Sequence, residues 1–188
     1  MIDMRLERVP FEFDGHTFQL CCNMNVLADV QEAFDGKISE ALSGKAGVRS
    51  LMEFLAAMLN DSADEQGIEA RYTSRQVGRM LAPVRMNEVK AIVMRLVGKA
   101  MSADTELSTE EKPKKLTDQV EPESRSIDFA WYLYAWMSVL KLDERSFWRT
   151  ATPARVAALL QAAAPRRTLQ REDKQQKSLS AYLLGGGG

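Results

Sequence analysis

The sequence is poor in the residues that carry catalysis and metal binding, with a single histidine, His16, and only two cysteines. Cys21 and Cys22 are neighbours, so a disulfide between them would close a small strained ring. With no Cys or His partner beside them, two adjacent thiols do not form a tetrahedral metal site. We therefore expect reduced thiols and no bound metal.

Charge of one sign and long apolar stretches are also scarce. The formal net charge is −1, so no global basic field argues for nucleic acid as a partner. The apolar stretches fall short of the roughly 20 residues that span a bilayer. The first ten residues, MIDMRLERVP, lack the apolar core of a signal peptide. These absences predict a protein that stays in the cytosol, with no membrane partner.

Catalytic motifs are absent as well. A Ser-His-Asp or Cys-His arrangement would have to use His16, which lies beside a predicted hairpin turn, where a solvent-facing side chain is the simpler interpretation. Neither G-x-x-x-x-G-K-[ST] nor G-x-G-x-x-G occurs, so no phosphate-binding loop is predicted. The sequence thus predicts a non-enzyme with no catalytic residues and no cofactor.

The first structural signal is a β-hairpin. Four apolar residues alternate with polar ones around the pair Asp14-Gly15: Phe11, Phe13, Phe18 and Leu20. This pair suits a type I′ turn, which needs positive φ at both central residues. Because an isolated hairpin is only marginally stable, we expect it to pack on the segments that come after it in the chain.

Those segments have helical periodicity. Apolar residues recur at helical spacing over 24–34, 51–59 and 86–97, which predicts three helices. The polar stretch 60–70, which contains Gly67, predicts a loop.

Thr73 with Gln76 resembles a capping box that opens a short further helix, and Pro83 limits it. The expected fold is therefore mainly α, with the N-terminal β-hairpin packed on a helical bundle over residues 1–101.

The composition changes after residue 101. Residues 102–126 contain two prolines, an excess of acidic residues and no aromatic residue, which predicts a flexible linker. Residues 127–164 predict a small aromatic helical module, in which Thr152-Pro153 opens the last helix. Residues 165–188 are polar and basic and predict a disordered tail.

All three tryptophans lie in this C-terminal module, which is too small to bury so much aromatic area by itself. The simplest interpretation is that the rings pack on each other or on the N-terminal part. The alternative makes part of the cluster a protein-binding surface, because Trp and Tyr are frequent interface anchors. The candidate partner-binding residues are Trp131, Tyr132, Trp136, Phe147 and Trp148.

The same module carries a family resemblance. An aromatic helix is followed by Leu140-Lys141-Leu142-Asp143-Glu144-Arg145-Ser146-Phe147-Trp148 and then by Thr152-Pro153. This order resembles the pattern of phage tail assembly chaperones and their gene-transfer-agent relatives, in which a Phe-Trp pair precedes a helix opened by Thr-Pro. Here three residues, not the usual two, separate the two pairs, and Arg155 stands where many relatives carry Glu. The layout resembles the long, frameshifted form of these chaperones.

The resemblance implies a role in phage tail assembly. Such chaperones bind the tape measure protein in the host cytoplasm, prevent its aggregation and recruit tail tube subunits, and they are absent from the mature virion. Ten methionines would provide an adaptable surface for such a client. The runner-up interpretation is a structural minor tail or connector protein of the particle, and a nucleic-acid adaptor is a third. Self-association is left open.

Overall fold

The computed structural model describes residues 6–43, 47–102 and 126–163 and confirms a mainly helical fold with an N-terminal hairpin. The N-terminal part comprises β1 (Val9–Phe13), β2 (His16–Leu20), α1 (Met24–Ala33), α2 (Ile38–Leu42), α3 (Val48–Gln66), α4 (Ser74–Met80), the 3-10 helix η1 (Pro83–Arg85) and α5 (Met86–Met101). The C-terminal module comprises α6 (Phe129–Tyr134), the π-helix η2 (Ala135–Val139), α7 (Glu144–Thr150) and α8 (Pro153–Ala163). None of the described helices is both long and apolar enough to cross a membrane.

The predicted hairpin is confirmed, including its turn. Asp14 and Gly15 have φ of 48° and 73°, as a type I′ turn requires. The outer edge of β2 meets α3, where the Gln19 backbone N–H donates to Ser62 Oγ at 2.7 Å. On the outer edge of β1, Arg85 Nη1 donates to the Glu12 carbonyl at 2.7 Å. Each edge of the hairpin is thus hydrogen-bonded to a helical element of the chain, which protects the hairpin from pairing with other strands.

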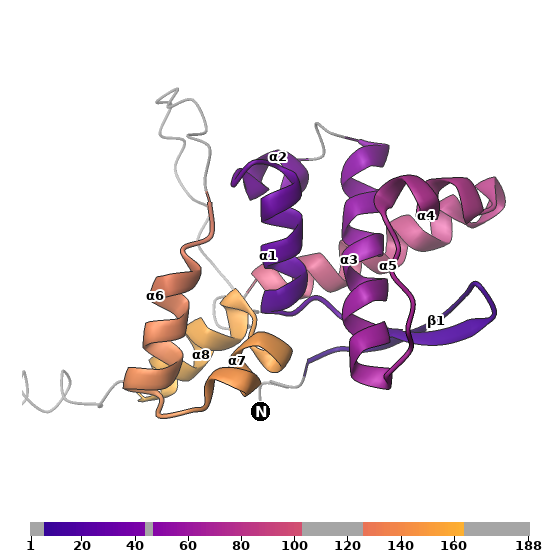
Figure 1. Cartoon of the computed structure of the whole chain (residues 1–188). Coiled ribbons are helices and arrows are strands. Elements are labelled where there is room, and N and C mark those ends of the chain that lie inside the picture. The colour runs from indigo at the N-terminus through magenta and orange to yellow at the C-terminus, as the bar shows by residue number, and fades with distance from the viewer. Residues whose placement is uncertain (1–5, 44–46, 103–125, 164–188) are drawn as a thin grey trace, which may run out of the picture.

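Helix α3 is the centre of the N-terminal part. It contacts α1, α4, α5 and β2, and Figure 1 shows α5 passing behind it toward α1. Its fully buried residues include Leu55, Met58 and Leu59. The capping box at Thr73 and Gln76 is confirmed and starts α4 on the same central helix. The core therefore lies between α3 and the elements around it.

The predicted loop over 60–70 is wrong in its first half, because α3 continues to Gln66. Two polar residues of this extension are buried rather than solvated, with Asp61 at 7% and Ser62 at 1% exposure. Their side chains bond to β2 and to the start of α1, so tertiary contacts stabilise helix where the composition indicates a loop. Gly67, at φ 68°, ends the helix in the left-handed conformation.

The aromatic segment of the C-terminal module is not a uniform α-helix. Asp128 caps α6 by accepting from the Trp131 N–H at 3.0 Å. From Ala135 the helix widens to η2, and the Leu140 N–H bonds the Ala135 carbonyl five residues earlier. Lys141, at φ 59°, then ends the segment. A π-turn rotates the next side chains relative to an α-helix, and such turns are frequent at functional sites.

The C-terminal module packs against the N-terminal part. Helix α7 contacts α1, and α8 contacts α5. Trp136, Phe147 and Val156 belong to the same cluster of buried residues as the hairpin and α3. Separate folding of 1–101 and 127–164 remains a prediction. The predicted linker and tail lie outside the described residues, apart from Ser102 and Ser126.

Candidate functional site

Exposed apolar side chains concentrate on the aromatic segment of the C-terminal module. Among the described residues, five of the nine exposed large hydrophobic residues lie between 131 and 142. They are Trp131, Tyr134, Met137, Val139 and Leu142, with exposures from 40% to 63%. We name this set the α6–η2 surface. Figure 1 shows α6 at the outer side of the module, away from the N-terminal helices. Clustering of this kind indicates an interaction site, whereas single exposed apolar residues are normal.

Two buried aromatic residues hold this surface in place. Trp136 and Phe147 are 1% and 0% exposed, and their ring centroids lie 6.2 Å apart in an edge-on arrangement. Trp136 Nε1 donates to the Asp143 carbonyl at 3.1 Å and to Ser146 Oγ at 3.0 Å. The guanidinium of Arg155 lies 5.8 Å from the Trp136 ring centroid. Helix α6–η2 is therefore fixed on α7 and α8 by one anchoring ring.

The five residues predicted to bind a partner fall into three groups. Trp131 is 51% exposed, Tyr132 and Trp148 are partly buried, and Trp136 and Phe147 are core residues. Trp148 packs on Phe129 at 6.2 Å, which fixes the entry of α6 against α7. Only Trp131 of this set thus presents most of its ring outward, edge-on to Tyr132 at 5.0 Å.

Sequence reasoning missed Tyr134, Met137, Val139 and Leu142 as surface residues. Their identity resembles that of the buried residues beside them, such as Ala135 and Trp136, so no compositional signal separates the two groups. The exposed and the buried residues differ instead in where they lie relative to α7 and α8. The π-turn contributes, because it changes the order in which side chains are arranged around the axis.

A buried polar group lies where α7 meets α1 and α3. The Asp61 carboxylate accepts from Asn23 Nδ2 at 2.7 Å and from Asn25 Nδ2 at 3.0 Å. Burial raises its pKa above the ordinary value, and the two amide donors oppose that shift. The same Asn23 amide lies 3.3 Å from the Arg149 carbonyl. This group therefore links three helices through neutral donors rather than through an ion pair.

Ion pairs join the residues before β1 to α3 and α5. Glu65 accepts two bonds from Arg8, and this pairing lowers the pKa of Glu65. Glu7 pairs with Arg95 and Lys99 of α5. These contacts tie the residues before β1 to α3 and α5, which is a structural role.

Both cysteines are free and buried. Burial raises the pKa of Cys21 to about 12 and raises that of Cys22 as well, so both thiols stay protonated at neutral pH. No group of three or more His, Cys, Asp or Glu residues within the described ranges has the arrangement of a metal site.

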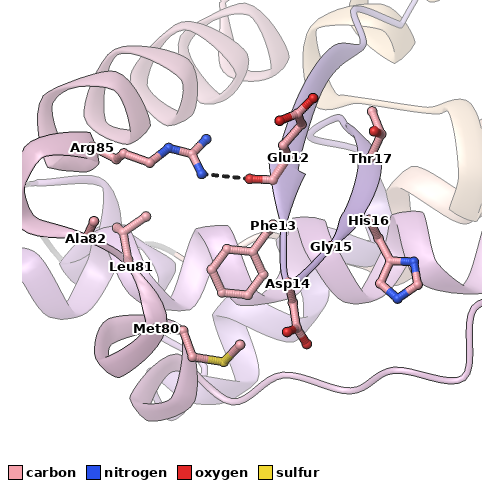
Figure 2. Close-up of a pocket in the computed structure, with 10 residues that line it drawn as sticks. All are labelled: Glu12, Phe13, Asp14, Gly15, His16, Thr17, Met80, Leu81, Ala82 and Arg85. Atoms are coloured by element: carbon pink, nitrogen blue, oxygen red, sulfur yellow. Dashed lines mark hydrogen bonds between the residues drawn. The ribbon is translucent and has the colours of Figure 1, made fainter.

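A pocket with a volume of about 580 Å³ lies at the hairpin tip. Figure 2 shows that the turn residues form one wall, and Met80, Leu81, Ala82 and Arg85 form the other. Arg85 is already engaged with Glu88 at 2.9 Å and with the Phe11 ring at 4.3 Å. His16 is exposed, as predicted, and in Figure 2 its ring lies apart from Arg85. The pocket thus gathers polar residues without a reactive arrangement between them.

Comparisons of the chain with protein-family models, with curated proteins and with solved structures give no match.

Proposed function

We propose that this protein is a phage tail assembly chaperone, which binds the tape measure protein through apolar helical segments and recruits tail tube subunits. The observation that carries the proposal is the α6–η2 surface, with five exposed large apolar residues on one short segment. The family resemblance lies in the same module, from Leu140 to Pro153.

The composition of the α6–η2 surface suits an apolar helical client. Trp131 and Tyr134 are residue types that dominate binding energy at interfaces, since each ring contributes a large area with few rotatable bonds. Met137 adds a flexible side chain that adapts to different partners. The exposed charged residues Asp128, Lys141 and Arg145 border the segment and supply the polar rim that interfaces usually have.

The surface is also preorganised. Trp136 and Phe147 are buried beneath it, and the Asp128 cap fixes its first turn. A rigid surface loses less conformational entropy on binding than a mobile one, so a smaller contact area suffices for a given affinity. This supports a role in which the chain offers a ready apolar face to newly made client segments.

The direct test is a double substitution in the α6–η2 surface, Trp131→Ser with Tyr134→Ser. The matched control is Val84→Ser with Met94→Ser, which alters two residues of 86% and 63% exposure in the N-terminal part. Each variant is co-expressed with the tape measure protein of the same genome, and client solubility and tube-subunit capture are measured. We expect the tape measure protein to become insoluble only with the first variant, at unchanged helicity. Equal client solubility with both variants would refute the assignment of this surface.

The alternative function, a structural minor tail or connector protein, makes a different prediction for the particle. A chaperone leaves the assembly, so mass spectrometry of purified particles should not detect this chain. Stoichiometric recovery from particles would favour the structural alternative.

A further inference from the structure

Two exposed cations lie at one end of the α6–η2 surface. Lys141 and Arg145 are exposed and stand on either side of Leu142, which belongs to that surface. Among the residues that the structure describes, no ion pair or side-chain hydrogen bond involves either cation. Both charges are therefore available to a partner that lies on the surface.

Lys141 has a backbone conformation that lysine rarely adopts. Within the described ranges, three residues other than glycine have positive φ: Asp14, Asp35 and Lys141. Aspartate tolerates this conformation because its short side chain can bond to nearby backbone groups, and glycine is the usual residue where a helix ends in this way. Lysine has neither advantage, so its presence at φ 59° costs local stability. Costs of this kind are concentrated at functional sites.

Hydrogen bonds on both sides of Lys141 hold this conformation. The Leu140 N–H donates to the carbonyl five residues earlier at 3.0 Å, and the Leu142 N–H donates to the Trp136 carbonyl at 3.1 Å. Trp136 Nε1 donates to the Asp143 carbonyl at 3.1 Å. The ring that anchors the surface thus also fixes this turn, and the backbone of Lys141 keeps a set position beside the surface.

Arg145 is likewise in a position that local structure does not favour. It lies in the first turn of α7, where a cation opposes the helix dipole. The cap of α7 is supplied by Asp143, which accepts the Ser146 N–H at 2.8 Å, and Glu144 lies 3.5 Å from Trp148 Nε1. Neither cation is therefore explained by the turn or the helix that carries it, and residues that break a local rule are expected where a protein binds or reacts.

We propose that Lys141 and Arg145 determine the specificity of the α6–η2 surface, and that they select an amphipathic client helix with carboxylates at one end. The inference rests on the proposed function, in which this surface binds an apolar helical segment. The apolar face of the client covers the surface, and its Glu or Asp side chains pair with the two cations. Such charge pairs fix the register of the bound helix and reject a helix with a basic end at this place.

The test removes the two charges and leaves the apolar residues of the surface unchanged. The charge variant is Lys141→Gly with Arg145→Gln, since glycine suits positive φ and glutamine is polar but neutral. The matched control is Arg79→Gln with Lys90→Gln, which removes two exposed cations of α4 and α5. The acidic probe is a fluorescent designed helix of Leu, Ala and Gln with two Glu residues at its N-terminal end, and the neutral probe has Gln in their place.

We expect the wild type to bind the acidic helix about five-fold more tightly than the neutral one at low salt, as two exposed charge pairs allow. The charge variant should bind both helices equally, and salt of roughly 1 M should abolish the preference of the wild type. The control variant and Lys141→Arg, which retains the charge, should keep the preference. Trp131→Ser with Tyr134→Ser should weaken the binding of both helices, because it removes two apolar residues that they share as contacts.

Urea denaturation separates this role from a structural one. A lysine that stabilised the end of η2 through its charge would make Lys141→Gly unfold at a lower urea concentration than the wild type. We expect a midpoint equal to that of the wild type or higher, because glycine adopts this φ without strain.

The proposal would be overturned by an equal preference for the acidic helix in the wild type and the charge variant, or by a wild type that binds neither helix. A lower urea midpoint for Lys141→Gly would overturn it too, because the charge would then stabilise the fold. None of these measurements involves the tape measure protein. The proposed function is judged separately, by client solubility with the Trp131→Ser and Tyr134→Ser variant.

Discussion

In the hairpin, Phe11, Phe13 and Phe18 are between 0% and 5% exposed, whereas Trp131 and Tyr134 of α6 are 51% and 63% exposed. The hairpin rings converge on Tyr72, with Phe13 at 5.3 Å and Phe18 at 6.0 Å, both edge-on. The α6 rings have helical neighbours on one side only. Aromatic residues thus stabilise the fold in the first region and form a surface in the second.

This difference comes from the neighbouring elements rather than from residue type. The hairpin is covered by α3 and by the segment before α4, so every ring on its inner face is enclosed. Helix α6 contacts chiefly its own continuation, η2, which contacts α7 and α8. An aromatic-rich segment therefore does not reveal its role until the elements around it are placed.

The largest expected effect is in the hairpin. Phe18→Ala should destabilise the chain by about 3–5 kcal/mol, because it removes a fully buried ring and leaves a cavity next to Tyr72. Urea denaturation followed by circular dichroism measures the change. A loss below about 1 kcal/mol would show that the hairpin is peripheral and would remove the contrast with α6.

The anchoring ring of the module should give an intermediate effect. Trp136→Phe keeps an aromatic ring but removes the Nε1 donor to Asp143 and Ser146, so we expect a loss of about 1–2 kcal/mol. Trp131→Phe is the matched control, since the structure gives the Trp131 indole no hydrogen bond within the described residues, and it should leave stability nearly unchanged. Equal losses in the two variants would mean that Trp131 is also a core residue.

The pH dependence of unfolding separates two acids of α3. The folded-state pKa of Glu65 is lowered by Arg8, so the folded state binds fewer protons there than the unfolded state. Its contribution should be present above the ordinary value of 4.5 and lost as the pH falls through the folded pKa. The stability difference between the wild type and Glu65→Gln should therefore shrink on acidification.

Asp61 should behave in the opposite way. Burial raises its folded-state pKa above 3.8, so the folded state holds the proton more tightly and this group favours folding more at lower pH. Equilibrium denaturation of the wild type and Asp61→Asn at several pH values measures the trend. A wild type that gains stability relative to Asp61→Asn as pH rises would contradict the direction of this shift.

The smallest expected effect on stability is at the α6–η2 surface. Trp131→Ala should change the free energy of unfolding by only about 0.5 kcal/mol, because the side chain is half exposed. The same substitution should reduce client solubilisation by the proposed chaperone, which thermal denaturation and co-expression measure side by side. A large loss of stability with normal client binding would mean that Trp131 stabilises the fold, as the hairpin rings do, and does not form a binding surface.

Several features could be predicted from the sequence alone, because local residues determine them. Asp14-Gly15 specified the turn, and Thr73 with Gln76 specified a helix start. Each depends on the backbone preferences of a few adjacent residues, which act wherever the segment lies. Apolar periodicity indicated the mainly helical class in the same way.

Tertiary structure decided the rest. The helical state of 60–66 depends on burial of Asp61 and Ser62 against β2 and α1, which no local pattern encodes. The contact of the C-terminal module with α1 depends on Gln31 and Asn23 bonding backbone groups 96 and 126 residues further along the chain. Which aromatic rings are core and which are surface depends on where α7 and α8 lie. Such contacts join residues far apart in sequence, so only the packed arrangement of the elements determines them.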